Sequence, residues 1–352
     1  MSDRPDFGRM ACPMPILDHD TVQLAHGAGG RLSADLIGRL ILPRFTSREL
    51  DRLEDQAVLD LPPGRVAFST DTFVVSPVFF PGGDIGELAV NGTVNDVAMS
   101  GARPLVLSVG FVLEEGLPLA DFHRILCSME AAARRAGVRV VTGDTKVVGR
   151  GACDRIFINT SGLGVVPAGV ELGAGRIRPG DAVILSGTLA DHGMAVMTVR
   201  EGLSFSSTVR SDTAALNDLV RLILDTCPAT RALRDPTRGG AATTLNEFAC
   251  AAGVGIVLEE AALPVRPDVR GACEILGIDP LYVANEGKLI AVVPGAAAEA
   301  VVAAMRGHEH GRDAVVIGRV TDEHAGRVTM TTGLGARRIV DMPVGEQLPR
   351  IC

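Results

Sequence analysis

Short β-branched runs alternate with helical patterns along almost the whole chain, and few fold classes accommodate this alternation. Residues 65–75 (RVAFSTDTFVV) alternate as a strand does, whereas residues 84–101 (DIGELAVNGTVNDVAMSG) space their apolar side chains as a helix does. The same order returns at residues 181–202, where DAVILSG precedes a helical DHGMAVMTVREG. Strands and helices that alternate through both halves predict an α/β fold.

A Gly- and Pro-rich stretch at residues 167–181 (PAGVELGAGRIRPGD) separates the two halves. The chain has 352 residues, which exceeds the usual size of one domain. We therefore expect two α/β domains. The expected order is an irregular leader at 1–20, a first domain at 21–167, a second domain at 178–338 and a tail at 339–352.

Charge and composition argue against several functional classes. The net charge is −8, from 34 Lys and Arg against 42 Asp and Glu, and no basic run suggests a nucleic-acid partner. The polar start MSDRPDFGRM lacks the apolar stretch of a signal peptide, and the apolar runs are too short for a membrane span. Seven Cys without a CxxC pair argue against a disulfide framework or a zinc site. These features predict a cytoplasmic protein.

Acidic residues follow strands or lie near Gly-rich turns at five places. Mg²⁺ with a polyphosphate needs such carboxylates, together with exposed backbone N–H groups for the phosphate oxygens. Each Asp alone is better explained as a helix N-cap. Taken together with Lys146, Arg238 and three Gly-rich turns, they favour a nucleotide site, although no Walker A sequence or GxGxxG is present. The five residues are Asp55, Asp71, Asp96, Asp144 and Asp235.

Three further residues raise separate questions. Glu286 in NEGK is either a functional carboxylate or a loop residue paired with Lys288. Asp84 in PGGDIG is a helix N-cap on one interpretation and a site residue on the other. Cys352 ends the sequence LPRIC, and a thiol at that place is exposed by sequence pattern and chemically reactive.

Six motifs together resemble a known family. They are DTFVVSPVFFPGGDIG, NGTVNDVAMSGA, TGDTKVV, RDPTRGG, NEGK and the terminal PRIC, and the resemblance that they carry covers the chain from about His26 to Cys352. In this order they resemble the HypE family of hydrogenase maturation proteins, within the PurM-like superfamily of aminoimidazole ribonucleotide synthetase and selenophosphate synthetase. The resemblance implies two PurM-like α/β domains, N-terminal strands that pair into a β-barrel across a homodimer, an ATP groove near that interface and a flexible C-terminal tail.

The resemblance also implies a reaction. A carbamoyl group delivered by the carbamoyltransferase HypF sits on Cys352 as a thiocarboxamide, and ATP-dependent dehydration converts it to a thiocyanate. The cyano group then passes to iron held by the HypC–HypD complex, as a ligand of the [NiFe] hydrogenase site. Phosphorylation makes the amide oxygen a good leaving group, with Mg²⁺ offsetting charge on the transferred group.

Site residues carry over from the family by position. Asp55, Asp96 and Asp235 match the Mg²⁺ ligands, and Glu286 and Lys146 match a pair that handles the amide protons. We rank Glu286 as the base and Lys146 as a phosphate or orientation group, because a Lys acts as a base only when its pKa is lowered. Asp84 is a candidate for positioning the tail. The expected nucleotide contacts are Asp71, Thr72, Asn95, Gly143, Asp144, Thr145, Arg238 and Gly239.

Two alternatives stay open at this stage. A selenophosphate synthetase or a purine-pathway cyclo-ligase would share the scaffold, but Arg31 and Leu32 follow Gly30 where selenophosphate synthetases usually carry Cys or selenocysteine soon after. Neither enzyme explains Cys352. A non-catalytic nucleotide-binding adaptor would instead use its tail to dock to a partner.

Overall fold

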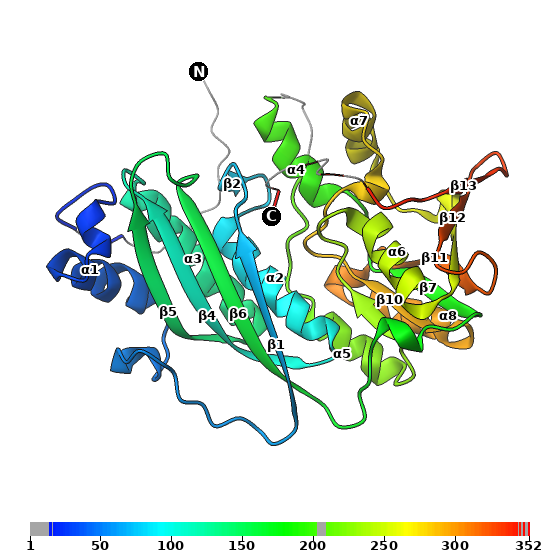
Figure 1. Ribbon diagram of the computed structural model, residues 1–352, viewed down its shortest axis with the longest axis horizontal. Helices are drawn as coiled ribbons and strands as arrows, with labels where there is room; N and C mark the ends of the chain where they lie inside the picture. The colour runs from blue at the N-terminus through cyan, green and yellow to red at the C-terminus, as the bar shows by residue number, and fades with distance from the viewer. Residues whose placement is uncertain (1–13, 16, 203–208, 344, 346–347, 349–350) are drawn as a thin grey trace.

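The computed structural model describes residues 14–15, 17–202, 209–343, 345, 348 and 351–352. Most of the predicted leader at 1–20, and Pro349 and Arg350 of the tail, therefore lie outside the described residues. Two α/β domains stand side by side in Figure 1, one around each of two sheets, so the predicted pair of α/β domains is confirmed.

The first domain is built on a four-stranded sheet in the order β1-β6-β4-β5. Helices α2 and α3 pack against one face, and a short ribbon of β2 and β3 leads into α2. The elements are α1 (Arg31–Leu36), β1 (Arg65–Phe73), β2 (Phe79–Phe80), β3 (Gly83–Asp84), α2 (Ile85–Met99), β4 (Arg103–Glu114), α3 (Leu119–Ala136), β5 (Arg139–Val148) and β6 (Ile156–Val166).

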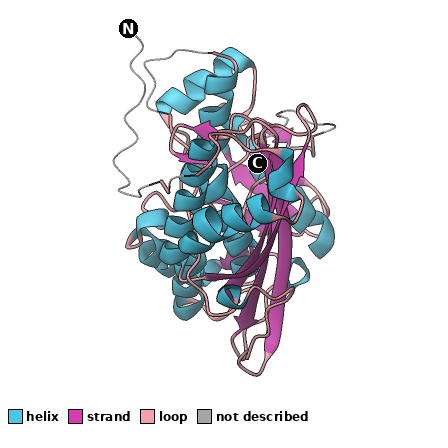
Figure 2. Ribbon diagram, turned by 90° about the vertical axis from the view of Figure 1, so that its left-hand side faces the viewer, coloured by secondary structure: helices cyan, strands magenta, loops and turns pink. Residues whose placement is uncertain are grey.

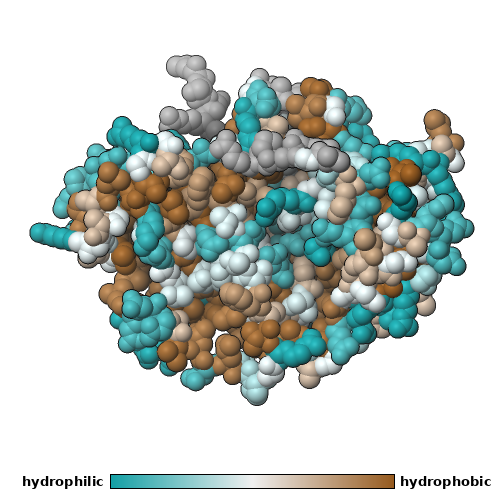
Figure 3. Space-filling view, in the orientation of Figure 1, coloured by the Kyte–Doolittle hydropathy of each residue, from teal (hydrophilic) through white to brown (hydrophobic). Residues whose placement is uncertain are grey.

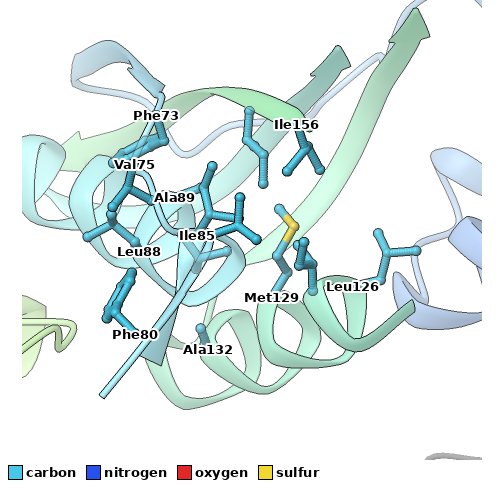
Figure 4. Packing of buried hydrophobic residues seen from close by; sticks show 14 of the residues in the cluster. Phe73, Val75, Phe80, Ile85, Leu88, Ala89, Leu126, Met129, Ala132 and Ile156 are labelled. Atoms are coloured by element: carbon cyan, nitrogen blue, oxygen red, sulfur yellow. The ribbon is translucent and has the colours of Figure 1, made fainter. Parts of the chain in front are cut away.

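Alternation along the strands decides which face of this sheet is buried. Phe73 and Ile156 point toward α2 and α3 and meet Leu88 and Met129 there, in the cluster drawn in Figure 4. On the opposite face Phe68 is 67% exposed. Figure 2 shows the helices gathered on one side of this sheet, and Figure 3 shows apolar side chains open to solvent over the first domain.

The second domain is built on a seven-stranded mixed sheet in the order β13-β12-β9-β11-β7-β10-β8. Only the β12–β9 pair is parallel. The elements are β7 (Asp181–Leu185), α4 (Asp191–Arg200), α5 (Asn217–Thr226), β8 (Ala232–Arg234), α6 (Gly240–Ala252), β9 (Gly255–Glu259), α7 (Pro267–Leu276), β10 (Ile290–Pro294), α8 (Ala298–Arg306), β11 (Val315–Thr321), β12 (Val328–Thr331) and β13 (Arg337–Ile339).

Helix α2 carries much of the contact between the domains. The Asn95 side chain accepts a hydrogen bond from the Leu216 N–H (2.8 Å) and donates one to the Ala214 carbonyl (3.0 Å). Asn95 is 1% exposed, so both ends of its amide serve this link. The predicted nucleotide contact is therefore, in this structure, a buried tie between the two domains.

Strand β5 includes Asp144, which the sequence analysis placed among the acidic residues that follow strands or lie near Gly-rich turns. β5 continues to Val148 and pairs with β4 along its length. Gly143 fits this pairing because a Cβ there would lie 2.5 Å from the Val109 carbonyl oxygen. The motif residues 143–146 thus lie within an edge strand rather than in a loop.

Alanine substitutions at two helical glycines should change the stability of the protein in opposite directions. A Cβ at Gly193 in α4 would collide with Val283, whereas a Cβ at Gly271 in α7 meets nothing within 4 Å. We expect Gly193→Ala to destabilise the protein by about 1–3 kcal/mol through overpacking. Gly271→Ala should stabilise it by about 0.5–1 kcal/mol, because Ala loses less backbone entropy in a helix. Calorimetric melting of both variants checks this, and shifts of the same sign would contradict it.

Candidate active site at the domain interface

Four acidic side chains gather where the two domains face each other. Asp71 lies on β1 and Asp96 on α2. The second domain supplies Asp235, directly after β8, and Glu286, in the turn before β10. Burial, together with the charges of Asp96 and Asp71, raises the pKa of Asp235 to about 7. Glu286 is 2% exposed, and burial and the neighbouring Asp235 raise its pKa well above the ordinary value.

The hydrogen bonds of this cluster leave capacity for a cation. Ser69 donates to Asp96 at 2.9 Å, and the Arg238 guanidinium lies 3.5 Å from the Asp71 carboxylate. Burial still raises the pKa of both of these Asp residues. The buried Oε1 of Glu286 has no hydrogen-bond partner among the described residues. Buried carboxyl groups in this state are stabilised by a metal ion or another cation.

The donor set fits a magnesium–nucleotide complex. Asp96 and Asp235 would supply hard oxygen ligands to such an ion, and Arg238 would supply a cation for phosphate. Gly239, with φ of +74°, precedes helix α6 and presents backbone there. Within the described residues, however, no three His, Cys, Asp or Glu side chains are arranged as a metal site. Asp55 lies exposed in the loop before β1, so the predicted ligand set stays a prediction.

A second group of predicted residues lies elsewhere on the chain. Lys146 is paired with Asp144 at 2.9 Å, and both are largely exposed on edge strand β5. Thr145 donates its N–H to the same carboxylate at 2.8 Å. These residues and Gly143 line a cavity of about 320 Å³ that also includes Glu54, the neighbour of Asp55. β5 lies three strands from β1, about 14 Å at the usual strand spacing, so one chain does not bring Lys146 to Asp71.

Asp84 is the N-cap of helix α2, which is one of the two interpretations that the sequence allowed. Its carboxylate accepts hydrogen bonds from the N–H groups of Gly86 (2.8 Å) and Glu87 (3.1 Å) and so caps α2. Ser128 of α3 donates to the same oxygen. The expectation that Asp84 positions the tail receives no support, because this carboxylate is committed to α2 and α3.

The end of the chain lies between the domains (Figure 1). The His192 ring lies 2.8 Å from the Ile351 carbonyl oxygen, and the Val74 N–H donates to a Cys352 oxygen at 3.3 Å. Cys352 lines a cavity of about 350 Å³. The other lining residues are Thr72, Val74, Arg238, Gly239, Thr243, Tyr282, Ala284, Pro343, Gly345, Leu348 and Ile351.

Comparison with known proteins agrees with this geometry. Family models of AIR synthase related proteins match the chain twice, the N-terminal domain at residues 53–166 and the C-terminal domain at 178–331. A relative from Cupriavidus necator named carbamoyl dehydratase HypE is 56% identical over 94% of this chain and 95% of its own length. The chain belongs to the HypE family.

Solved structures of HypE proteins agree with this assignment. A HypE in complex with ATP superposes with a TM-score of 0.90 at 51% identity, covering 94% of this chain and 99% of the other. The structure of a HypE–HypF complex gives a TM-score of 0.77 at 48% identity, covering 88% of this chain and 99% of that one. Among the described residues, no helix combines the length and apolar character that crossing a bilayer requires.

Sequence reasoning missed several residues of this HypE-family site. His192 and Ser211 lie beneath the tail, and Asp212 forms a buried ion pair with Lys288 at 3.0 Å. Lys288 is therefore paired with Asp212, and among the described residues no ion pair joins it to Glu286. No motif identifies these residues. The one available signal is DHG at residues 191–193, which contains His192 and follows a strand and its loop as the other polar sites do.

The raised pKa of Asp235 makes the stability of the metal-free protein depend on pH. The folded state favours the protonated Asp235 carboxyl more than the unfolded state does. Its contribution to the free energy of unfolding is therefore complete below pH 3.8, the ordinary pKa of Asp, and is lost as the pH rises through about 7. Near pH 8 we expect the Tm of Asp235→Asn to exceed that of the parent by at least ~2–4 °C, which corresponds to a stability difference of about 1 kcal/mol. Near pH 5 this advantage should largely vanish.

Melting curves in chelator at both pH values provide the measurement. Asp144→Asn is the matched control, because Lys146 lowers the pKa of that exposed carboxyl and the substitution should give no gain at high pH. An equal gain for Asp235→Asn at both pH values would contradict the assignment.

Proposed function

We propose that the chain is an ATP-dependent carbamoyl dehydratase that converts a carbamoyl group carried on Cys352 into a thiocyanate. One observation carries the proposal. Cys352 lines the same cavity as Thr72, Arg238 and Gly239, the residues suited to a nucleotide phosphate. A thiol held beside a phosphate site fits a carrier whose cargo is activated in place.

The reaction removes one water from the carried group. The carbonyl oxygen must leave carbon, and both amide protons must leave nitrogen, so that S–C(=O)–NH₂ becomes S–C≡N. ATP with Mg²⁺ supplies the phosphoryl group that turns this oxygen into a good leaving group. On the protein side, Arg238 and the backbone at Gly239 orient the phosphate, and Asp96 and Asp235 hold the metal.

Glu286 is our candidate for the base that takes the amide protons. Its turn begins next to Ala284, which lines the cavity beside Cys352. A carboxylate with a raised pKa accepts a proton more readily once ionised, and Oε1 is not engaged by the described residues. We assign Lys146 to phosphate binding or orientation, reached from a second copy of the chain rather than within one chain.

The proposed partners follow from the same arrangement. A HypF-type carbamoyltransferase loads Cys352, as the existence of a HypE–HypF complex supports. A HypC–HypD complex accepts the cyano group, so the tail has to leave the cavity twice in each cycle. We further propose a homodimer through the uncovered face of the first sheet, where Val66 and Phe68 are exposed.

Mass spectrometry of the C-terminal peptide tests the activity. With the transferase, carbamoyl phosphate and ATP, we expect Cys352 to gain a carbamoyl group and then to lose one water. Cys352→Ala should show neither change, whereas Cys250→Ala, which removes an exposed thiol, should behave as the parent. An unmodified peptide in protein that binds ATP and the transferase would instead support a nucleotide-binding adaptor.

Replacing the proposed base should separate loading from dehydration. Glu286→Gln keeps the shape of the side chain but cannot accept the protons, so we expect normal carbamoylation and a turnover lowered by about 10²–10⁴-fold. Glu299→Gln on the exposed face of α8 is the matched control. The assignment fails if Glu286→Gln dehydrates the carried group at the parental rate.

A further inference from the structure

The last two residues of the chain are held at three points. The Ile351 carbonyl oxygen lies 2.8 Å from His192 Nε2, and a Cys352 oxygen accepts the Val74 N–H at 3.3 Å. The Ile351 side chain is 3% exposed and belongs to the apolar cluster that includes Val75 and Phe80. All three contacts involve backbone groups or residue 351, so none of them uses the thiol.

The hydrogen bonds define the state of the His192 ring. A carbonyl oxygen only accepts, so Nε2 must carry the proton that it donates to Ile351. His192 is fully buried, and burial lowers its pKa, which favours the neutral ring. Nδ1 is then an acceptor for the Ser211 hydroxyl, 2.8 Å away. The ring is thus fixed in the one tautomer that can hold the tail.

Ser211 is itself held rigidly. Its N–H donates to the Pro81 carbonyl (2.8 Å), and its Oγ accepts the Thr213 N–H (3.1 Å). Gly82, with φ of +95°, permits this approach, because a Cβ there would lie 2.7 Å from the Ser211 nitrogen. Phe80 packs edge-on against the imidazole with ring centroids 5.4 Å apart. The Gly-rich PGGD turn thereby supports the ring that contacts the tail.

We infer that His192, oriented by Ser211, is a positioning residue that seats the carrier tail through the Ile351 carbonyl. The inference rests on the proposed function in treating Cys352 as a carrier. Because the seat grips the residue before the thiol, it holds the bare, carbamoylated and cyanated tails in the same way. The cargo can therefore change chemically while its attachment point stays fixed in the cavity that Arg238 and Gly239 also line.

Alkylation of Cys352 measures the seat without relying on catalysis. The full-length protein is treated with iodoacetamide, and the labelling rates of the Cys352 and Cys250 peptides are compared by mass spectrometry. Cys250 is exposed on α6 and serves as the internal reference. We expect His192→Phe to raise the Cys352 rate about 10-fold relative to Cys250, since a buried carbonyl loses its donor. His192→Gln, which keeps a donor near the Nε2 position, should stay close to the parent.

A variant in the tail serves as a second test in case His192→Phe disturbs the fold. Ile351→Asn alters only the tail, so it should also raise the labelling rate about 10-fold by removing the apolar anchor. Combined with His192→Phe, it should add little, because both release the same segment. Equal Cys352 labelling in the parent, His192→Phe and Ile351→Asn would overturn the inference.

Turnover separates seating from the proposed activity. In carbamoylated protein, His192→Phe should lower kcat for dehydration and leave the KM for ATP unchanged, because only the seated fraction reacts. Faster labelling without any dehydration in the parent would uphold the seat and reject the proposed function. An unchanged kcat together with faster labelling would overturn the positioning role.

Discussion

A buried ion pair between Asp212 and Lys288 organises the interface on which the site depends. Burial opposes ionisation of Asp212, but the Lys288 ammonium and the hydrogen bond from the Glu286 N–H nevertheless hold the pKa of that carboxyl below its ordinary value. Its second oxygen accepts the Glu286 N–H at 3.1 Å, and Gly287 leaves room for the Asp212 carbonyl. The pair thus fixes the turn that carries Glu286. Removing one partner of such a pair costs about 3–5 kcal/mol, so the turn is held firmly.

The segment around Asp212 connects three functions that lie apart in the sequence. Ser211 orients the ring beneath the tail, Asp212 fixes the Glu286 turn, and residues 214–216 receive both ends of the Asn95 amide. A displacement of this segment would therefore be felt at the tail, at the candidate base and at helix α2 together. Rigid support of this kind is what precise placement of a reacting group requires.

Local patterns predicted the elements well, because helix and strand periods depend on neighbouring residues alone. They also identified Asp71, Asp235 and Glu286, which the fold brings together. Which motifs meet depends instead on strand order, and that order leaves Lys146 on an edge strand away from the cluster. The sequence did not identify His192, because its role comes from contacts with residues 211 and 351. These residues are distant in the sequence and meet His192 only in the folded structure.

The acidic cluster is divided between the domains, with Asp71 and Asp96 on one side and Asp235 and Glu286 on the other. When ionised, these carboxylates repel one another across the interface, and a cation between them would relieve that repulsion. Under the proposed function, a metal bound there would hold the two domains together as well as take part in the reaction, and part of its binding energy would go into closing the interface. By reciprocity, a ligand that binds better to the opened interface would weaken the affinity for the metal. The factor would equal that by which the metal weakens the affinity for this ligand.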